Sequence, residues 1–215
     1  MSAGSEDTGW RTNLEETVVS GVGSFVLGYV ALYVLRGDQI MRNFWRGFRA
    51  TGATRSQLQE LGVQVPEQWK VVGMVYHSVH NADYRFTLVT ESGEVSRTLG
   101  RPFLSGKWLP WLIPMAALVV GGYALARRLD IRSPEAAAKA GAGIVAGYAP
   151  AAILTVWVFS WTETTTRLGQ TSTMTLGPDL VSTAVFVGVL YPVVFGGLGG
   201  HLWASTTTAS GVEPS

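Results

Sequence analysis

The chain contains no cysteine, only three histidines, and few charges for its 215 residues. Without cysteine it can form no disulfide framework, thiolate metal site or cysteine nucleophile. Charged residues make up 14% of the chain, whereas soluble domains average about 25%. This low share argues against intrinsic disorder and against a nucleic-acid partner, because both need many charges.

Four long stretches lack charge altogether. They are residues 17–35, 108–126, 140–161 and 180–204. Each is 19 to 25 residues long, and a helix needs about 20 residues to cross the hydrocarbon layer. None shows a polar face at helical spacing, so a soluble four-helix bundle is disfavoured. The sequence therefore predicts an all-α membrane protein with four transmembrane helices and a small α+β insertion between helices 1 and 2.

The segments between these stretches complete the predicted organisation. They are a polar N-terminal segment (1–16), a surface α+β region (36–107), a short basic loop (127–139), a Thr-rich loop (162–179) and a disordered tail (205–215). In residues 38–50, five apolar side chains share one helical face, and Arg42, Arg46 and Arg49 share the other. This pattern favours a helix lying in the membrane interface, with its arginines toward lipid phosphates. The alternative is a helix whose apolar face points inward onto a small domain.

Three further elements are expected in the polar segments. Residues 54–62 suggest a short helix that ends at a glycine. Residues 69–80 are apolar but too short to span a membrane, so they suggest an interfacial or core segment. Residues 85–99 predict a β-hairpin with Ser92-Gly93 at its turn. The loop 162–179 suggests an irregular or short-hairpin connection.

Small residues and prolines recur within the uncharged stretches. Rows of Ser, Gly and Ala at four-residue spacing let helices approach closely, either within one bundle or between protomers. Pro150 and Pro192 can kink their helices, and each lies beside a tyrosine, Tyr148 and Tyr191. These four residues could line a polar path, or the hydroxyls could bond carbonyls freed by the kinks.

Orientation follows from the distribution of basic residues. The short loop 127–139 carries four of them, whereas 162–179 carries only Arg167. The positive-inside rule, which is most reliable for short loops, places 127–139 and both termini in the cytoplasm. Five arginines that closely follow the first uncharged stretch, at positions 36, 42, 46, 49 and 55 of the long segment 36–107, oppose this assignment. We expect a plasma-membrane protein with cytoplasmic termini.

Groups able to carry chemistry are scarce. His77, His80 and Asp83 lie at three-residue spacing and would share one helical face as weak candidate metal ligands. On a strand, the two histidines would point to opposite faces. No nucleophile elbow, phosphate loop or catalytic carboxylate pair occurs, so no enzyme activity, cofactor or catalytic residue is expected. Apart from His201 at the end of the last, the uncharged stretches hold no Asp, Glu, Lys, Arg or His, which argues against a self-sufficient coupled transporter.

Two segments carry a resemblance to a known family. SGVGSFVLGYVALYVL (residues 20–35) and WKVVGMVYHSVHNADY (residues 69–84) are similar to parts of an uncharacterised haloarchaeal multi-pass membrane family, sometimes loosely labelled transporters. The resemblance implies an archaeal, transporter-like protein, and the excess of arginine over lysine, 13 to 3, suits such a source. It supplies no catalytic residues.

From the residues, we expect a non-enzymatic accessory or assembly subunit. Its partners would be the lipid bilayer and either further copies of itself or a larger membrane complex. The alternative is a small oligomeric permease or channel that uses the Tyr-Pro kinks.

Overall fold

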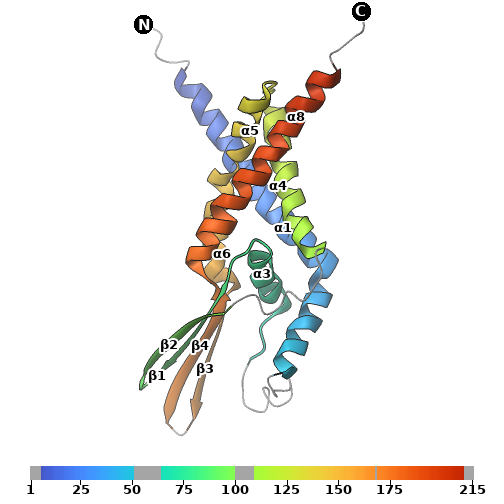
Figure 1. Cartoon of the computed structure of the whole chain (residues 1–215). Coiled ribbons are helices and arrows are strands. Elements are labelled where there is room, and N and C mark those ends of the chain that lie inside the picture. The colour runs from blue at the N-terminus through green and yellow to red at the C-terminus, as the bar shows by residue number, and fades with distance from the viewer. Residues whose placement is uncertain (1–5, 51–63, 100–108, 168, 211–215) are drawn as a thin grey trace, which may run out of the picture.

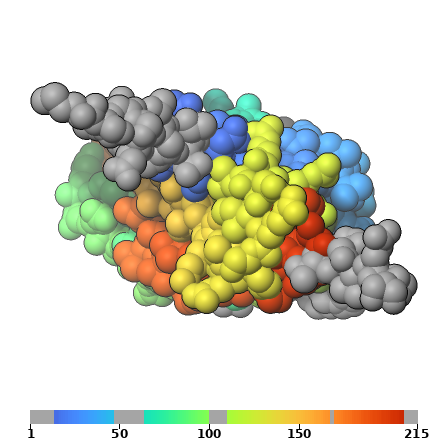
Figure 2. All heavy atoms as spheres, turned by 90° about the horizontal axis from the view of Figure 1, so that it is seen from above, coloured from blue at the N-terminus to red at the C-terminus, as the bar shows by residue number. Residues whose placement is uncertain are grey.

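The computed structural model describes residues 6–50, 64–99, 109–167 and 169–210. Figure 1 shows two parts, a helical bundle and a four-stranded sheet that projects from one end of it. In this view the first and last described helices cross, and the start of α1 and the end of α8 lie at the end of the bundle away from the sheet. Viewed from that end, α5 (yellow) lies between α1 (dark blue) and α8 (red) in Figure 2.

The helices and strands follow one another along the chain. In order they are α1 (Glu6–Ala50), α3 (Gln68–Ser78), β1 (Tyr84–Thr90), β2 (Gly93–Leu99), α4 (Leu109–Arg128), α5 (Pro134–Ala142), α6 (Val145–Phe159), β3 (Trp161–Arg167), β4 (Gln170–Pro178), α7 (Leu180–Ser182), the π-helical η1 (Thr183–Leu190) and η2 (Pro192–Gly196), and α8 (Gly197–Ser210). Among the described residues, four helical stretches are long and apolar enough to cross a membrane. They are Leu14–Arg46, Pro110–Arg128, Pro134–Phe159 and Leu180–Thr207. The four helices expected from the uncharged stretches are therefore present.

The predicted boundaries of these helices need correction. The loop 127–139 is shorter than expected, because Ser133, Pro134 and Glu135 start α5 within it. Trp161 begins strand β3 instead of ending the third span. The expected tail 205–215 is helical to Ser210, because α8 continues without a break. Residues 211–215 and the short helix expected at 54–62 lie outside the described residues.

The prediction of an interfacial helix after residue 35 is wrong in its main form. Helix α1 continues without interruption to Ala50. Ile40 and Phe44 are buried in the core, so their face is not available to lipid. Arg42 and Arg46 are exposed on the other side. The apolar face thus points inward, as the alternative prediction had it, while the Arg49 side chain lies outside the described residues.

Small residues pack the helices within one chain. A Cβ atom at Gly147 of α6 would lie 2.0 Å from the carbonyl oxygen of Val18 in α1. At Gly200 of α8, it would lie 1.9 Å from the carbonyl oxygen of Ala137 in α5. Only glycine permits backbones to approach this closely. These two rows of small residues therefore serve packing inside the bundle.

The sheet joins two hairpins that are far apart in the sequence. Its strand order is β2-β1-β4-β3, and all neighbouring strands are antiparallel. The hairpin expected at 85–99 is confirmed, and loop 162–179 forms a second hairpin. On one face, cross-strand threonine pairs bond through their hydroxyls, at 3.2 Å for Thr162 with Thr175 and 3.0 Å for Thr164 with Thr173. The neighbouring row on the other face is more apolar and contains Leu88, Val95 and Met174, with Glu163 at its end.

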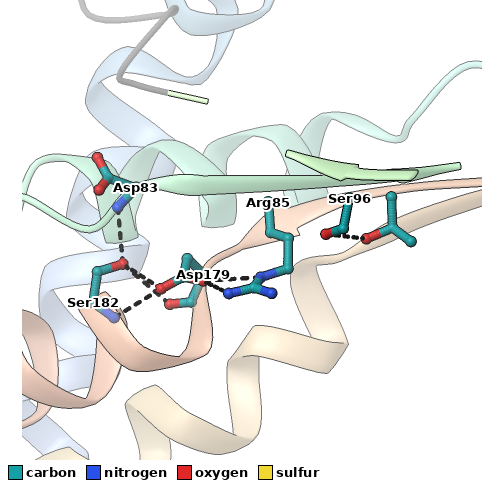
Figure 3. Close-up of polar contacts among 6 residues, drawn as sticks. Asp83, Arg85, Ser96, Asp179 and Ser182 are labelled. Atoms are coloured by element: carbon teal, nitrogen blue, oxygen red, sulfur yellow. Dashed lines mark hydrogen bonds and ion pairs between the residues drawn. The ribbon is translucent and has the colours of Figure 1, made fainter. Parts of the chain in front are cut away.

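An ion pair fixes the sheet to the bundle (Figure 3). Arg85 of β1 contacts Asp179 through two nitrogens, Nε at 2.9 Å and Nη2 at 2.5 Å. Asp179 also caps the fourth apolar helical stretch, because its Oδ1 accepts the backbone N–H of Ser182 at 2.9 Å. The Ser182 hydroxyl in turn accepts the backbone N–H of Asp83 at 3.1 Å. Strand β1 and the helix start are therefore held in one network.

Acid is expected to weaken this network. Burial alone raises the pKa of Asp179, but hydrogen bonds from Ser182 and Arg85 outweigh burial and hold the pKa below 3.8. A carboxyl group whose pKa is lowered in the folded state stabilises the protein at pH values above its ordinary pKa. That stability is lost as the pH falls through the folded-state pKa. Lowering the pH from about 6 to about 3 should therefore reduce the unfolding temperature of the wild type more than that of Asp179→Asn, which keeps a capping side chain. Thermal unfolding in detergent at the two pH values measures this difference.

The exposed pair between Asp130 and Arg132 provides the control. Asp130→Asn should leave the pH dependence of the unfolding temperature as it is in the wild type, because exposed pairs contribute little. Equal pH dependence in wild type and Asp179→Asn would contradict the stabilising role of the ion pair.

Candidate functional site

Helix α3 enters the bundle from the side of the sheet. Its first residue lies near α1, where the Gln68 amide donates to Asp38 Oδ1 at 3.3 Å. From Val71 to His80 every residue is buried. Asn81 then takes a left-handed conformation with φ 67°, which ends the helical path and turns the chain back toward β1. Helix α3 thus carries polar side chains into the bundle without crossing it.

Three aromatic side chains form a closed circuit of hydrogen bonds at the inner end of α3. The hydroxyls of Tyr76 and Tyr148 lie 2.7 Å apart. The Tyr148 hydroxyl lies 2.8 Å from His80 Nε2, and His80 Nδ1 lies 2.7 Å from the Tyr76 carbonyl oxygen. All three side chains are fully buried. The circuit starts and ends on Tyr76 and ties α3 to α6.

The direction of each hydrogen bond follows from the chemistry of its partners. A carbonyl oxygen only accepts, so His80 Nδ1 carries a proton, and in the neutral ring Nε2 accepts from Tyr148. Tyr148 then has no proton left for Tyr76, so the Tyr76 hydroxyl donates to Tyr148. The carbonyl oxygen of Phe25 in α1, at 3.2 Å, shares the same proton.

His77 forms a second set of contacts. Its Nε2 lies 3.1 Å from the Thr155 hydroxyl, which donates to the Ala151 carbonyl oxygen at 2.8 Å. Thr155 therefore accepts from Nε2, and His77 Nδ1 accepts from the Thr183 hydroxyl at 3.3 Å. The two histidines thus adopt opposite tautomers, and both nitrogens of each ring are occupied.

Tyr191 joins the same layer from the fourth apolar stretch. The Asn81 amide donates to its hydroxyl at 2.8 Å, and the His80 ring lies 5.0 Å from its ring. The helix around Tyr191 is π-helical, and the Tyr191 N–H donates to the Phe186 carbonyl oxygen. Pro192, which has no N–H, follows directly. Such wide turns often occur at functional sites.

We call these residues the buried polar layer: Tyr76, His77, His80, Asn81, Tyr148, Thr155, Thr183 and Tyr191. Phe25, Tyr148 and Tyr191 lie near the middle of the uncharged stretches 17–35, 140–161 and 180–204. The layer therefore extends from mid-height of the apolar part of the bundle, at Tyr148 and Tyr191, toward the sheet, at Thr183. Its groups are hydroxyls, an amide and uncharged imidazoles, which can donate hydrogen bonds to a polar ligand or accept them from it.

The proposed metal triad is wrong in its geometry. Helix α3 ends at Ser78, so no helix presents His77, His80 and Asp83 on one face. The histidine nitrogens already bond to the groups described above, and Asp83 lies beside Ser182 in the turn before β1. Within the described ranges, no group of three His, Asp or Glu side chains could hold a metal ion.

The kink residues meet different partners from those expected. The hydroxyls of Tyr148 and Tyr191 bond to side chains of residues 76–81, on α3 and the turn after it. Pro192 is buried, whereas Pro150 is exposed on the outside of α6. Arg42 and Arg46 lie on the exposed side of α1 and outside the layer.

The sequence-based argument that the bundle lacks ionisable groups also needs correction. The uncharged stretches themselves hold no Asp, Glu, Lys or Arg, and their one histidine, His201, lies near the end of the fourth. Helix α3 and the turn after it, however, supply His77 and His80 to the interior. Sequence reasoning had not singled out Tyr76, Asn81, Thr155 or Thr183. The spacing of Tyr76 and His80 by four residues was the available signal, because it places both on one side of a helix.

The fold and the layer together define a class: a bundle of four helices apolar enough to cross a membrane, closed around a buried polar layer and carrying a sheet at one end. The chain belongs to a family of unknown function, DUF7978, whose model matches residues 2–207. No curated protein and no solved structure matches the chain. The expected membership of an uncharacterised family is confirmed, while a haloarchaeal source stays a prediction.

Proposed function

We propose that this chain is a multi-pass protein of the plasma membrane that acts as a non-enzymatic accessory or assembly subunit. Four apolar helices of spanning length support the membrane placement. The polar layer contains no carboxylate, amine or thiol, and its histidines are held by hydrogen bonds inside the bundle. A role in assembly needs no reactive group.

The observation that carries the proposal is the exposure of the projecting sheet. Strand β2 is exposed at all seven positions, and Val95 and Leu99 are 52% and 37% exposed. Val89 of β1 is also exposed, at 43%. A sheet with a solvated edge and apolar side chains gains stability when another surface covers it. We infer that the partner binds along β2.

The basic end of the bundle supports cytoplasmic termini. Arg127, Arg128, Arg132 and Lys139 are exposed at the end opposite the sheet. Because the chain lacks cysteine, single cysteines can report sidedness directly. From outside intact cells, a thiol reagent should label Ser92→Cys in the sheet and spare Ser133→Cys. The reverse pattern would place the sheet in the cytoplasm.

Purification from native membranes in mild detergent tests the assembly role. Val95→Lys introduces a charge on the apolar row of β2, and Ser92→Lys introduces the same charge at the neighbouring turn. We expect Val95→Lys to lower partner recovery about tenfold, equivalent to about 1.4 kcal/mol, while Ser92→Lys retains it. Equal recovery with both variants, or no partner with the wild type, would contradict the proposal.

A second function, an oligomeric permease or channel, is favoured by the position of the polar layer. Neutral hydroxyls and imidazoles at mid-bundle can line a path for a polar solute. In reconstituted vesicles, Tyr191→Phe would then change solute flux. If the wild type shows no flux, the permease or channel function is contradicted and only the assembly role remains.

A further inference from the structure

A groove lies on the outside of the bundle between α1 and α4. Its volume is about 260 Å³, and its lining includes Ser20, Gly23 and Leu27 from α1, and Val120, Ala124 and Arg128 from α4. All but the last belong to the apolar parts of the two helices. The groove is thus an apolar hollow with one cationic side chain.

Gly23 has no packing role that accounts for it. A Cβ atom built there would meet nothing within 4 Å, whereas a Cβ at Gly21, two residues earlier, would meet the backbone of α6. Glycine inside a helix costs about 1 kcal/mol relative to alanine. The absent side chain therefore deepens a surface that no described residue covers.

The groove is polar at the end near Arg128 and apolar at the end near Leu27. Arg128 is the last residue of α4 and bonds to Glu16 through Nη1 at 2.6 Å. Val19 and Ser20 follow on α1, and Leu27 marks the other end. From Val19 to Leu27 a helix rises about 12 Å at 1.5 Å per residue. This length is close to one leaflet of a hydrocarbon core about 30 Å thick.

We propose that this groove binds one acyl chain of an anionic phospholipid, whose phosphate lies against Arg128. The inference rests on the membrane placement proposed above. An apolar chain with an anionic head matches both the hollow and the cation at its end. The bond to Glu16 occupies one of the five N–H donors of the guanidinium, and the others can reach a phosphate.

The size of the groove favours a lipid chain over a helix of a second copy. A helix with its side chains is about 10 Å across, whereas a hollow of about 260 Å³ accommodates a single narrow chain. A phosphate also complements Arg128.

Native mass spectrometry after exchange into vesicles of phosphatidylglycerol and phosphatidylcholine tests the site. The wild type should retain one phosphatidylglycerol molecule. Gly23→Leu fills the groove and should lower this retention about tenfold, or about 1.4 kcal/mol, whereas Val30→Leu, elsewhere on the exposed side of α1, should not. Arg128→Gln should abolish the preference for phosphatidylglycerol, and Glu16→Gln should strengthen it. Equal retention by Gly23→Leu and Val30→Leu would overturn the proposal.

Two further results separate the alternatives. Efficient disulfide cross-linking of Gly23→Cys between copies would assign the groove to a second protomer and overturn the lipid proposal. Recovery of the wild type in the soluble fraction of lysed cells would overturn the membrane placement, and with it the lipid site. Membrane recovery without retained lipid would overturn the lipid site alone.

Discussion

Replacing Gly21 by alanine is expected to destabilise the bundle by about 2 kcal/mol, within the range for overpacked cores. The same replacement at Gly23 should be neutral or slightly stabilising. A Cβ atom at Gly21 would lie 2.1 Å from the Ile144 carbonyl oxygen and 2.6 Å from the Tyr148 backbone nitrogen. Neither backbone atom can rotate away, so α1 and α6 would have to separate.

Separation of these helices would also disturb the polar layer. The Phe25 ring packs edge-on against Tyr148 at 5.2 Å, and the Phe25 carbonyl oxygen contacts Tyr76. Phe25 lies one turn along α1 from Gly21, and Tyr76 and Tyr148 both contact Phe25. The cost of the substitution therefore includes weaker hydrogen bonds as well as the steric conflict.

The comparison between the two glycines removes the effect of helix propensity. Alanine is favoured over glycine by about 1 kcal/mol at either position, so the difference between the variants reports the close contact. Thermal or denaturant unfolding in detergent, followed by tryptophan fluorescence, measures it. Equal stability of Gly21→Ala and Gly23→Ala would show that α1 and α6 are not in contact there.

Tyr148→Phe is expected to lower the free energy of unfolding by about 2 to 3 kcal/mol, because two buried groups lose their partner. Tyr76 loses the acceptor at 2.7 Å, and His80 Nε2 loses its donor at 2.8 Å. The ring itself stays, so the packing against Phe25 is kept. The loss is measured by the same unfolding experiment.

Two variants provide controls for Tyr148→Phe. Tyr33→Phe removes a hydroxyl from a ring that is 37% exposed and should change stability little. Tyr76→Phe removes the other end of the shared hydrogen bond, so its effect and that of Tyr148→Phe should not add in the double variant. Simple additivity would contradict the circuit.

Structural features that depend on local composition could be predicted from the sequence. Absence of charge located the four apolar helices, because a span must exclude ionised groups over its whole length. The strand preference of threonine and valine, with Ser92-Gly93 at the turn, located the first hairpin. The apolar character and short length of residues 69–80 allowed a core segment there, which is where α3 lies.

Features that depend on distant residues could not be obtained in this way. No local pattern pairs β1 with β4, because their register joins Tyr84 to Pro178. The charge of Arg36 suggested that the first span ends at residue 35, yet α1 continues to Ala50. Gly37 is buried within this helix, where a Cβ would meet the Gln68 amide at 2.6 Å. The side-chain hydrogen-bond partners of His77 and His80 likewise lie on α6 and η1, more than sixty residues away.

The long sequence separation of these contacts sets an order of events during synthesis. When residues 64–99 leave the ribosome, α1 is present, but α6, β4 and η1 have not yet been made. The imidazoles of α3 and the inner edge of β1 must therefore wait, in water or at the bilayer surface, until about eighty further residues arrive; such non-local pairing is intrinsically slow. The buried segment 71–80 is thus among the last to complete its contacts, and a chain truncated before residue 180 would lack its partners Thr183 and Tyr191.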